Sequence, residues 1–337
     1  MYIFSQPTVR RIEDTIRYEW ANQWRDAPTW QYRITGVEKP TGETSTIQFR
    51  EPTVKVYRLG PQGAGMIFDP TIRKQMVYEA EAVGNGLKLY RRQMAKQEEV
   101  GIQTAGEWAE EAGQAAAYYD VRGTVGLMHS GLGTNPVVTA FDGLPLFSKL
   151  HPVGGASDST YSNEHNGMPF TAENLAVGWA YISQLRHGAD APRRLTDQGL
   201  IVVLPTNYKF RGDQALRADW YSDVLNAQAA AVNTLKTGYG FQEPIIDPEF
   251  AAFPDTWFLC VPAGRRPTDS GLVLVQDEPF SINTYTHLDN VTLGTEQTLE
   301  YHQRAWLGFA AGQPYYVHRF RASGVIDAYM QQIKDNF

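Results

Sequence analysis

The sequence predicts an α+β protein, with helices in the middle of the chain and a strand-rich C-terminal end. Two patterns predict this fold class. Apolar residues recur every three or four positions in several segments before residue 190, which is typical of helices, whereas from Leu272 onward they alternate with polar residues, as in strands. The 337 residues are 42% hydrophobic and 12% aromatic, which supplies enough apolar surface for a folded core.

The composition also excludes several classes of protein. Cys260 is the single cysteine, so an internal disulfide framework and a cysteine-based zinc site are excluded. No apolar run reaches the roughly 18 to 20 residues of a membrane span, and no secretory signal follows Met1. The net charge is −7 and no basic stripe is present, so sequence-specific nucleic-acid binding is not expected. We therefore expect a soluble protein of a reducing compartment.

The first predicted element is an amphipathic helix from Thr8 to Asp26. Its apolar positions follow helical spacing and are Val9, Ile12, Ile16, Trp20 and Trp24. Two partners for this apolar stripe remain open at this point. The stripe packs either on its own domain or, as an arm, on a neighbouring subunit.

Residues 30–75 are expected to be extended. Apolar and polar residues alternate there, and prolines and glycines interrupt the segment. A long hairpin with so few apolar residues is marginal when isolated. It therefore needs support from the rest of the fold or from another chain.

A long helix, broken once, is predicted next. Its first part spans Met76 to Met94, where apolar residues are spaced by four, three, four, three and four, and Gly84 and Gly86 weaken it. Its second part restarts after residue 101, with Thr104 and Glu107 as a capping box.

The remaining chain is predicted as a turn-rich loop followed by short helices and strands. The loop covers residues 129–170, and a capped helix starts at Thr171 and runs to about Arg186. Pro205–Thr206 is expected to end a strand and cap another helix. The predicted strands are Leu200–Leu204, Ile245–Ile246, Trp257–Val261, the region from Leu272 that includes residues 299–309, and Tyr315–Arg321.

The search for catalytic, cofactor and metal sites predicts none. The sequence has no phosphate-binding glycine loop, no H-E-x-x-H motif and no serine elbow, and its seven histidines lack ligand spacing. Glu164–His165 is interpreted as an isolated polar pair, His302 and His318 as solvent-facing or hydrogen-bonded strand residues, and Cys260 as a buried apolar residue. By elimination, the residues favour a structural or interaction protein.

One block of sequence resembles a known family. Residues 141–155 (FDGLPLFSKLHPVGG), Ser162–Asn163 and residues 170–175 (FTAENL) follow the order and spacing seen in the major head subunit of Mu-like tailed bacteriophages. The resemblance continues through residues 233–238, 255–259, 300–309 and 314–321. It covers roughly residues 75–323 of the chain.

The resemblance implies the Hong Kong 97-type capsid fold. This fold has an N-terminal arm, an extended E-loop hairpin, a P-domain with a long spine helix, and an A-domain. On this sequence the parts fall at 1–35 for the arm, 36–75 for the E-loop, 76–169 for the P-domain with its spine helix and following loop, 170–270 for the A-domain, and 271–337 for the return to the P-domain and the C-terminal tail. The spine helix is placed at Met76–Met94.

The function that this resemblance implies is that of a major capsid protein. Such a subunit assembles with copies of itself into hexamers and pentamers of an icosahedral shell that encloses double-stranded DNA. A separate scaffolding protein and a portal are expected partners, and the expected location is the virion, after assembly in the host cytoplasm. Lys39 and Lys55 lie where some relatives form crosslinks, but no motif identifies a partner, and crosslinking is not predicted.

Two alternatives remain beside the capsid interpretation. An encapsulin-like cellular nanocompartment would keep the fold and change its role, and it would need an inner pocket for a cargo peptide. An unrelated α+β enzyme with a dispersed active site would instead form a small oligomer with a concave pocket.

Overall fold

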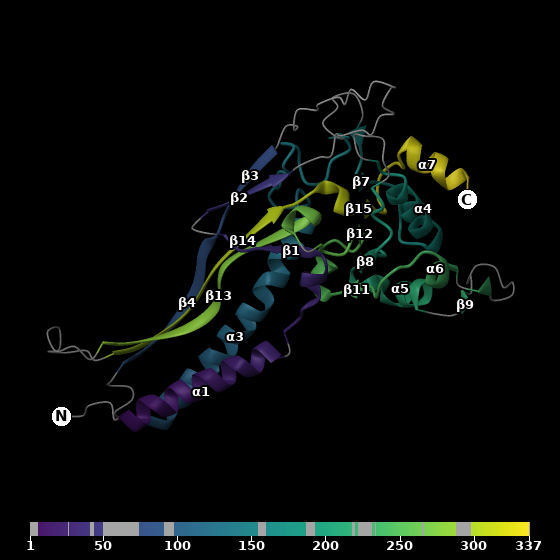
Figure 1. The fold of residues 1–337 in the computed structure, drawn as a ribbon. Coiled ribbons are helices and arrows are strands. Elements are labelled where there is room, and N and C mark those ends of the chain that lie inside the picture. The colour runs from purple at the N-terminus through teal and green to yellow at the C-terminus, as the bar shows by residue number, and fades with distance from the viewer. Residues whose placement is uncertain are drawn as a thin grey trace, which may run out of the picture.

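Two β-sheets and one long helix organise the protein (Figure 1). The computed structural model describes residues 6–25, 27–40, 44–49, 74–90, 98–153, 160–186, 193–217, 220–221, 231–232, 234–264, 266–287 and 298–336. Helix α1, near the N-terminus, lies at one end of the elongated molecule, and the C-terminal helix lies at the other (Figure 1). None of the described helices combines the length and apolarity of a bilayer span.

The first sheet has four strands in the order β1-β13-β14-β4. The strands are β1 (Thr35–Glu38), β4 (Glu81–Tyr90), β13 (Leu272–His287) and β14 (Thr298–Ala311), and only the β1–β13 pair is parallel. Strands β13 and β14 form a long hairpin that extends away from the second sheet (Figure 1). The register shifts on both sides of Glu278, next to Pro279, which lacks an N–H for the ladder.

Strand β14 has one buried and one outward face, as its alternation predicts. Leu299, Tyr301, Ala305 and Leu307 are at most 2% exposed and face the helices. Glu300, His302 and Arg304 are less buried and alternate with them, whereas Gln303 is buried and donates to the Ala112 carbonyl oxygen at 3.0 Å. The predicted strand and its orientation are therefore confirmed.

Helices α1 (Gln6–Arg25) and α3 (Glu98–Met128) lie together on the inner face of this sheet. Ile12 and Ile16 are 0% and 1% exposed and pack against Ala105 and Ala109 of α3. The same cluster includes Tyr301 of β14. The predicted N-terminal helix is confirmed, and its apolar stripe is covered by its own chain, so the alternative in which this stripe docks on a neighbour is wrong.

Small residues let the two helices approach closely. A Cβ on Gly113 would lie 2.9 Å from Cβ of Gln23, and one on Gly106 would lie 3.3 Å from Cγ2 of Thr15. Thr8 Oγ1 donates a hydrogen bond to Glu98 Oε1 at 2.8 Å. These contacts advance along both helices in the same order, so α1 and α3 run in the same direction.

The predicted helix at Met76–Met94 is wrong. The chain instead forms strand β3 (Lys74–Glu79) and then β4, which pairs with β14 from Leu307↔Glu81 to Thr298↔Tyr90. Gly84 suits this strand because a Cβ there would lie 2.2 Å from the Gln303 carbonyl oxygen. Close backbone approach, and not a helix bend, explains this glycine.

The long helix lies further along the chain and is unbroken over 31 residues. It begins at Glu98, so the predicted capping box at Thr104 is also wrong. Thr104 is inside the helix, where its Oγ1 donates to the Val100 carbonyl at 2.8 Å. Glu98 and Glu99 supply the negative charge of the first turn.

Within the segment 30–75, the predicted extended structure is confirmed at 35–38, 44–49 and 74–75 and is wrong at Trp30–Arg33. Strand β2 (Thr44–Phe49) pairs antiparallel with β3, while residues 50–73 lie outside the described part of the chain. The preceding residues form a 3₁₀ turn, η1 (Trp30–Arg33), and strand β1. Strand β1 joins the four-stranded sheet, which anchors the start of the hairpin.

The second sheet has five strands in the order β11-β8-β12-β15-β7. Its strands are β7 (Glu164–His165), β8 (Ile201–Leu204), β11 (Ile245–Ile246), β12 (Thr256–Cys260) and β15 (Val317–Arg321). The predicted strands at these positions, apart from β7, are confirmed. The other elements are β5 (His151–Pro152), β6 (Thr160–Tyr161), α4 (Ala172–Ser183), η2 (Thr206–Tyr208), α5 (Lys209–Leu216), β9 (Trp220–Tyr221), β10 (Ala231–Val232), α6 (Thr234–Gly238), η3 (Pro248–Ala252), η4 (Pro267–Asp269), η5 (Pro314–Tyr316) and α7 (Ala328–Asp335).

The C-terminal region divides between the two sheets. Strands β13 and β14 belong to the four-stranded sheet, but β15 and α7 pack with the second sheet and α4. Phe320, Met330 and Ile333 are part of that core. The last strand and helix of the chain therefore contribute to the core of the second sheet.

Helix α4 begins as the sequence predicts. The Thr171 hydroxyl accepts a hydrogen bond from the Asn174 N–H at 3.1 Å, which satisfies one of the free amides at a helix start. The predicted cap at Thr206 is wrong, since η2 precedes α5 and no side chain caps either element.

Candidate functional site

The described part of the sequence block, residues 141–153, contains a buried polar network. Asp142 Oδ2 lies 2.6 Å from His151 Nδ1, and the two side chains are 2% and 0% exposed. The other imidazole nitrogen lies 3.2 Å from the Leu146 carbonyl oxygen. Asp142 also accepts the Leu144 N–H at 3.1 Å, which fixes the Asp-Gly turn. These contacts hold the loop in place.

Asn163 joins this loop to the C-terminal part of the chain. Its amide donates to the carbonyl oxygens of Leu146 at 2.7 Å and of Pro314 and Val317 at 3.2 Å. Its side-chain oxygen accepts the Ser148 N–H at 2.9 Å. The side chain is fully buried, so these bonds offset its desolvation.

Arg319 is a buried cation that the sequence analysis missed. Its guanidinium donates to Glu164 Oε1 and to the Ser130 carbonyl, both at 2.7 Å, and lies 4.2 Å from the centre of the Phe147 ring. Burial lowers the pKa of Arg319, and the Glu164 carboxylate opposes that shift. Glu164 is therefore no isolated loop residue. The feature that could have identified Arg319 is its position inside a predicted strand whose residues are mostly buried.

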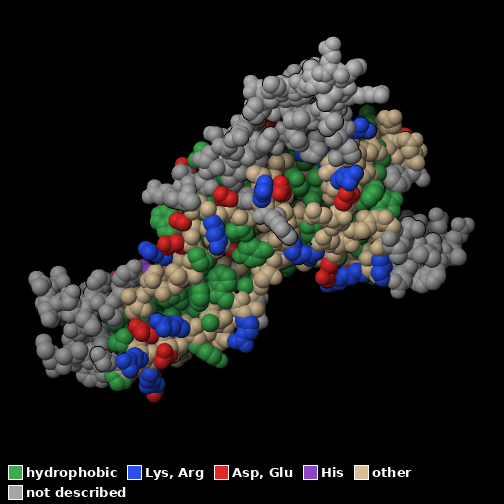
Figure 2. Space-filling model, viewed as in Figure 1, with side chains coloured by type: hydrophobic (Ala, Val, Ile, Leu, Met, Phe, Trp, Pro, Cys, Tyr) green, Lys and Arg blue, Asp and Glu red, His purple; other side chains and the backbone are tan. Residues whose placement is uncertain are grey.

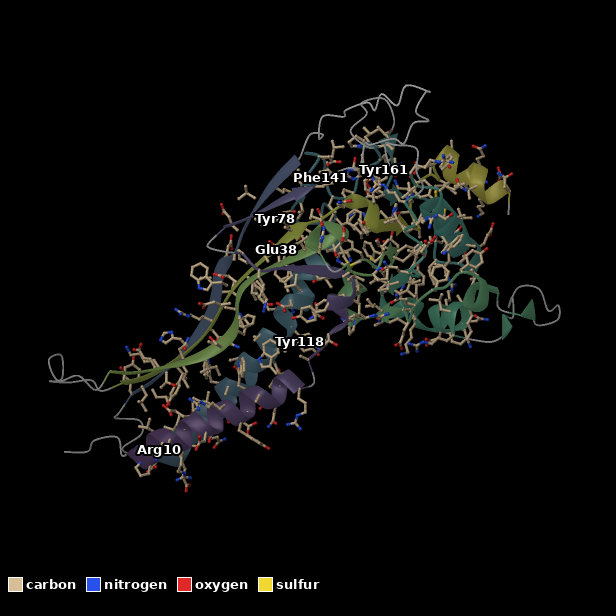
Figure 3. All side chains as sticks on the ribbon, in the orientation of Figure 1. Arg10, Glu38, Tyr78, Tyr118, Phe141 and Tyr161 are labelled. Carbon is tan, nitrogen blue, oxygen red and sulfur yellow. The ribbon has the colours of Figure 1, made fainter. Side chains whose placement is uncertain are left out.

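A column of stacked rings runs beside this network. The His151 and Tyr161 ring centres are 5.3 Å apart, and those of Tyr161 and Tyr315 are 4.0 Å apart. The Arg193 guanidinium lies 3.1 Å from the Tyr315 ring centre. The column connects the loop to the segment that follows α4. Phe141 and Tyr161 are labelled in this upper part of Figure 3.

Two histidines distant in sequence meet in the second sheet. His165 Nε2 lies 3.4 Å from His318 Nδ1, and both rings are fully buried. Burial lowers the pKa of His318 to about 3 and holds that of His165 well below its usual value. Both rings are therefore neutral near pH 7. His318 also lies 3.2 Å from the Tyr315 carbonyl oxygen through Nε2, which confirms the hydrogen-bonded alternative.

The part of the chain that the structure describes contains no cluster of three histidine, cysteine or acidic side chains able to hold a metal. Cys260 is 1% exposed, and burial raises the pKa of its thiol. The prediction of a buried apolar cysteine is confirmed.

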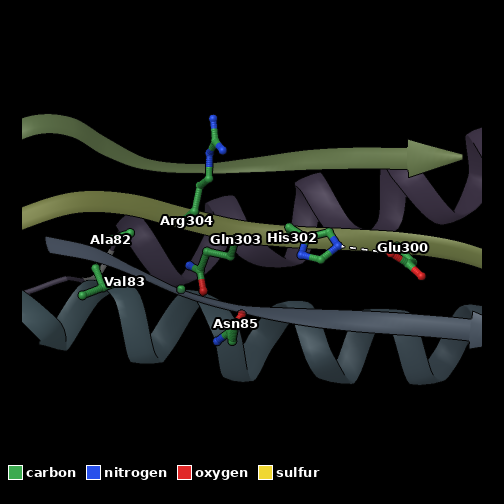
Figure 4. A pocket seen from close by; sticks show the side chains of 8 residues that line it. Ala82, Val83, Asn85, Glu300, His302, Gln303 and Arg304 are labelled. Carbon is green, nitrogen blue, oxygen red and sulfur yellow. Dashed lines mark hydrogen bonds and ion pairs between the residues drawn. The ribbon is translucent and has the colours of Figure 1, made fainter.

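The outer face of β4 and β14 carries a shallow groove of about 590 Å³. Lys88 Nζ lies 2.9 Å from Glu300 Oε1, and His302 Nε2 lies 3.5 Å from Glu300 Oε2. Figure 4 shows Glu300, His302 and Arg304 along β14, with Asn85 on the neighbouring strand. The groove is lined by polar residues of β14 and also by Ala82 and Val83 of β4, so its wall is mixed in character. His302 is 46% exposed through its side chain, as the alternation of β14 predicts.

Aromatic and charged residues also cover the junction of β1 and β3. Tyr78 donates a hydrogen bond to the Ala311 carbonyl at 2.8 Å, and burial, aided by Glu38, raises its pKa. Glu38 and Tyr78 are labelled at this junction in Figure 3. Val77, on the alternate face of β3, is 60% exposed. The base of the β2–β3 hairpin is thus anchored on the first sheet.

No protein-family model matches the chain, and no curated protein does. Among solved structures, a chain of the procapsid of bacteriophage JBD30 is 12% identical, with a TM-score of 0.48 over 99% of this chain and 82% of that chain. A chain of Mycobacterium phage Patience is 12% identical, with a TM-score of 0.49 over 94% and 87% of the two chains. A chain of the capsid of cyanophage P-SCSP1u is 9% identical, with a TM-score of 0.48 over 88% of each chain. Each of these three TM-scores is below 0.5, and each identity is at most 12%.

Proposed function

We propose that this protein is the major capsid subunit of a tailed bacteriophage head and assembles into an icosahedral shell around double-stranded DNA. The observation that carries the proposal concerns the block that resembles Mu-like head subunits. Asp142, His151 and Asn163 of that block are buried and hydrogen-bonded. The resemblance therefore lies in contacts that determine the fold, which supports a shared architecture.

In this proposal each part of the subunit has an assembly role. Residues 1–35 form the N-terminal arm, whose helix rests on its own subunit, and 36–75 form the E-loop. The spine helix is α3, and the A-domain comprises 170–270 together with β15 and α7. The E-loop hairpin and the β13–β14 hairpin supply surface that neighbouring copies bury. Obligate interfaces commonly bury about 2,000 Å² or more in total.

The proposed partners are other copies of the chain, in hexamers and pentamers, with a separate scaffolding protein and a portal during assembly. The net charge of −7 suits a shell that contains DNA without holding it tightly. We propose a structural role in the virion after assembly in the host cytoplasm, with no catalysis, cofactor or covalent crosslink.

Electron microscopy of the purified protein tests this function, first expressed alone and then together with the scaffold encoded beside it. Shells, tubes or capsomer-sized rings are expected. A monomer or small oligomer that persists with the scaffold present would contradict the proposal and favour an enzyme. Shells that form without scaffold and enclose a protein cargo would favour a cellular nanocompartment.

A further inference from the structure

Helix α1 exposes a row of arginines on the side that faces away from the sheet. The row consists of Arg10, Arg11, Arg17 and Arg25, all exposed, with Asp14 as the acid among them. Arg10 is labelled near the start of this helix in Figure 3. In Figure 2, basic and acidic side chains reach the surface at this end of the molecule.

Helix α3 exposes the opposite charge next to this row. Glu99, Glu107, Glu110 and Glu111 are exposed on the side turned away from the sheet. No lysine or arginine occurs between residues 98 and 121. The first turns of α3 therefore present an acidic row with no base among the residues of the helix before Arg122.

The two rows are not neutralised within the subunit. In the described ranges, none of these eight side chains forms an ion pair. Glu107 accepts a hydrogen bond from Gln103 at 2.9 Å, and Arg25 bonds to Asn22 of its own helix. Because α1 and α3 are held together by apolar and small residues, their charged sides remain available to another molecule.

The spacing of the rows is also complementary. Arg10 and Arg17 are two turns apart, about 10 Å along the axis, and Glu99 and Glu107 are about 12 Å apart. We propose that the arginine row of α1 docks on the glutamate row of α3 in a neighbouring copy of this chain. This inference rests on the proposed function and names one contact of the assembly.

A second copy suits these surfaces better than nucleic acid does. The acidic row lies beside the arginines and would repel a polyanion. Two different patches that bind each other form a head-to-tail contact, and such contacts generate rings. Charge pairs of this kind set register and partner choice more than affinity.

Charge reversal tests the contact. The variants are R10E/R17E, E99R/E107R and the combination of all four substitutions, with K209E/R211E on exposed α5 as a charge-matched control. Assembly with scaffold is measured by gradient sedimentation and electron microscopy, and circular dichroism checks folding. Each reversed pair is expected to reduce shell yield roughly tenfold. The combination is expected to restore it, and the control to leave it unchanged.

Several results would overturn this contact while leaving the capsid function intact. One is that R10E/R17E forms shells as well as the wild type does. Another is that the combined variant folds but does not recover shell assembly. A third is that the control variant loses as much shell yield as the reversed pairs. Complete R10E/R17E shells that lose only their nucleic acid would assign the arginines to nucleic acid instead. A salt-sensitive dimer would indicate a two-fold contact that closes and cannot form rings. Failure of the wild type to assemble with scaffold would instead count against the capsid function.

Discussion

The Asp142 carboxylate and the His151 imidazole lie 2.6 Å apart, with side chains 2% and 0% exposed. They are nine positions apart in the sequence, and the turn at Gly143, with a φ of +84°, brings them together. Each supplies a polar partner that the other could not obtain from solvent at this depth. This pair therefore stabilises the loop between the sheets.

We expect His151→Ala to destabilise the subunit by about 3–5 kcal/mol, because it leaves a buried carboxylate without its partner. Asp142→Asn keeps the shape and is expected to cost less. Guanidinium denaturation of the isolated subunit measures both. Equal, small effects would show that the pair contributes little to stability.

Gly113→Val is expected to cost about 1–3 kcal/mol, because its side chain would push α1 away from α3. A Cβ at this position already lies 3.1 Å from the Trp20 carbonyl oxygen. Gly126→Ala is the matched control on the same helix, since nothing lies within 4 Å of its Cβ. That change is expected to stabilise the protein by up to about 1 kcal/mol. Thermal unfolding compares the two, and identical melting temperatures would contradict the predicted close packing.

Stability is expected to fall as the pH is lowered from about 6.5 toward 5. The folded-state pKa of His318 is about 3, and that of His165 is also lowered, mainly by burial. The unfolded chain therefore binds more protons than the folded chain in this range, and each such histidine contributes a slope of about 1.4 kcal/mol per pH unit. His129, with a pKa lowered to about 4, adds to the same slope.

His318→Asn is expected to reduce the slope of the unfolding free energy against pH by the contribution of one histidine. Denaturation at several pH values between 5 and 6.5 measures this slope. His302→Asn is the control, because that side chain is half-exposed. An unchanged slope in the His318 variant would mean that this histidine does not remain neutral in the folded protein.

Cys260 is expected to resist thiol reagents until the protein unfolds. Its side chain lies in β12 at 1% exposure, and burial raises the pKa of the thiol, so little thiolate forms. Labelling with a maleimide across a denaturant series should follow global unfolding. Fast labelling in buffer alone would show that the second sheet opens locally.

Local patterns were sufficient for many elements of this protein. Helix α1, the cap of α4 at Thr171 and the alternation along β14 follow from spacing and from the side chains themselves. Cys260 lies in a run of apolar residues, and such a run is buried in any compact arrangement. These features depend on neighbours in sequence, so the sequence alone determined them.

The region from Met76 to Met94 shows where local patterns are ambiguous. Residues four apart share one face of a helix and also one face of a strand, so Val83 and Leu87 fit both. This segment forms a strand because it pairs with residues 298–307, which lie more than 200 positions away in the sequence. Gly84 then fits the backbone of the adjacent strand.

Tertiary structure alone also decided which surfaces are covered and which polar groups meet. The sequence left open whether the apolar stripe of α1 packs on its own domain or on a neighbouring subunit. In the fold, the small residues of α3 in the same chain cover it. Arg319 and Glu164 are 155 positions apart, and no spacing rule connects them. The sequence determined the periodicity and polarity of each segment. The long-range pairings depended on the fold, because burial and hydrogen bonding are satisfied only once distant segments are in contact.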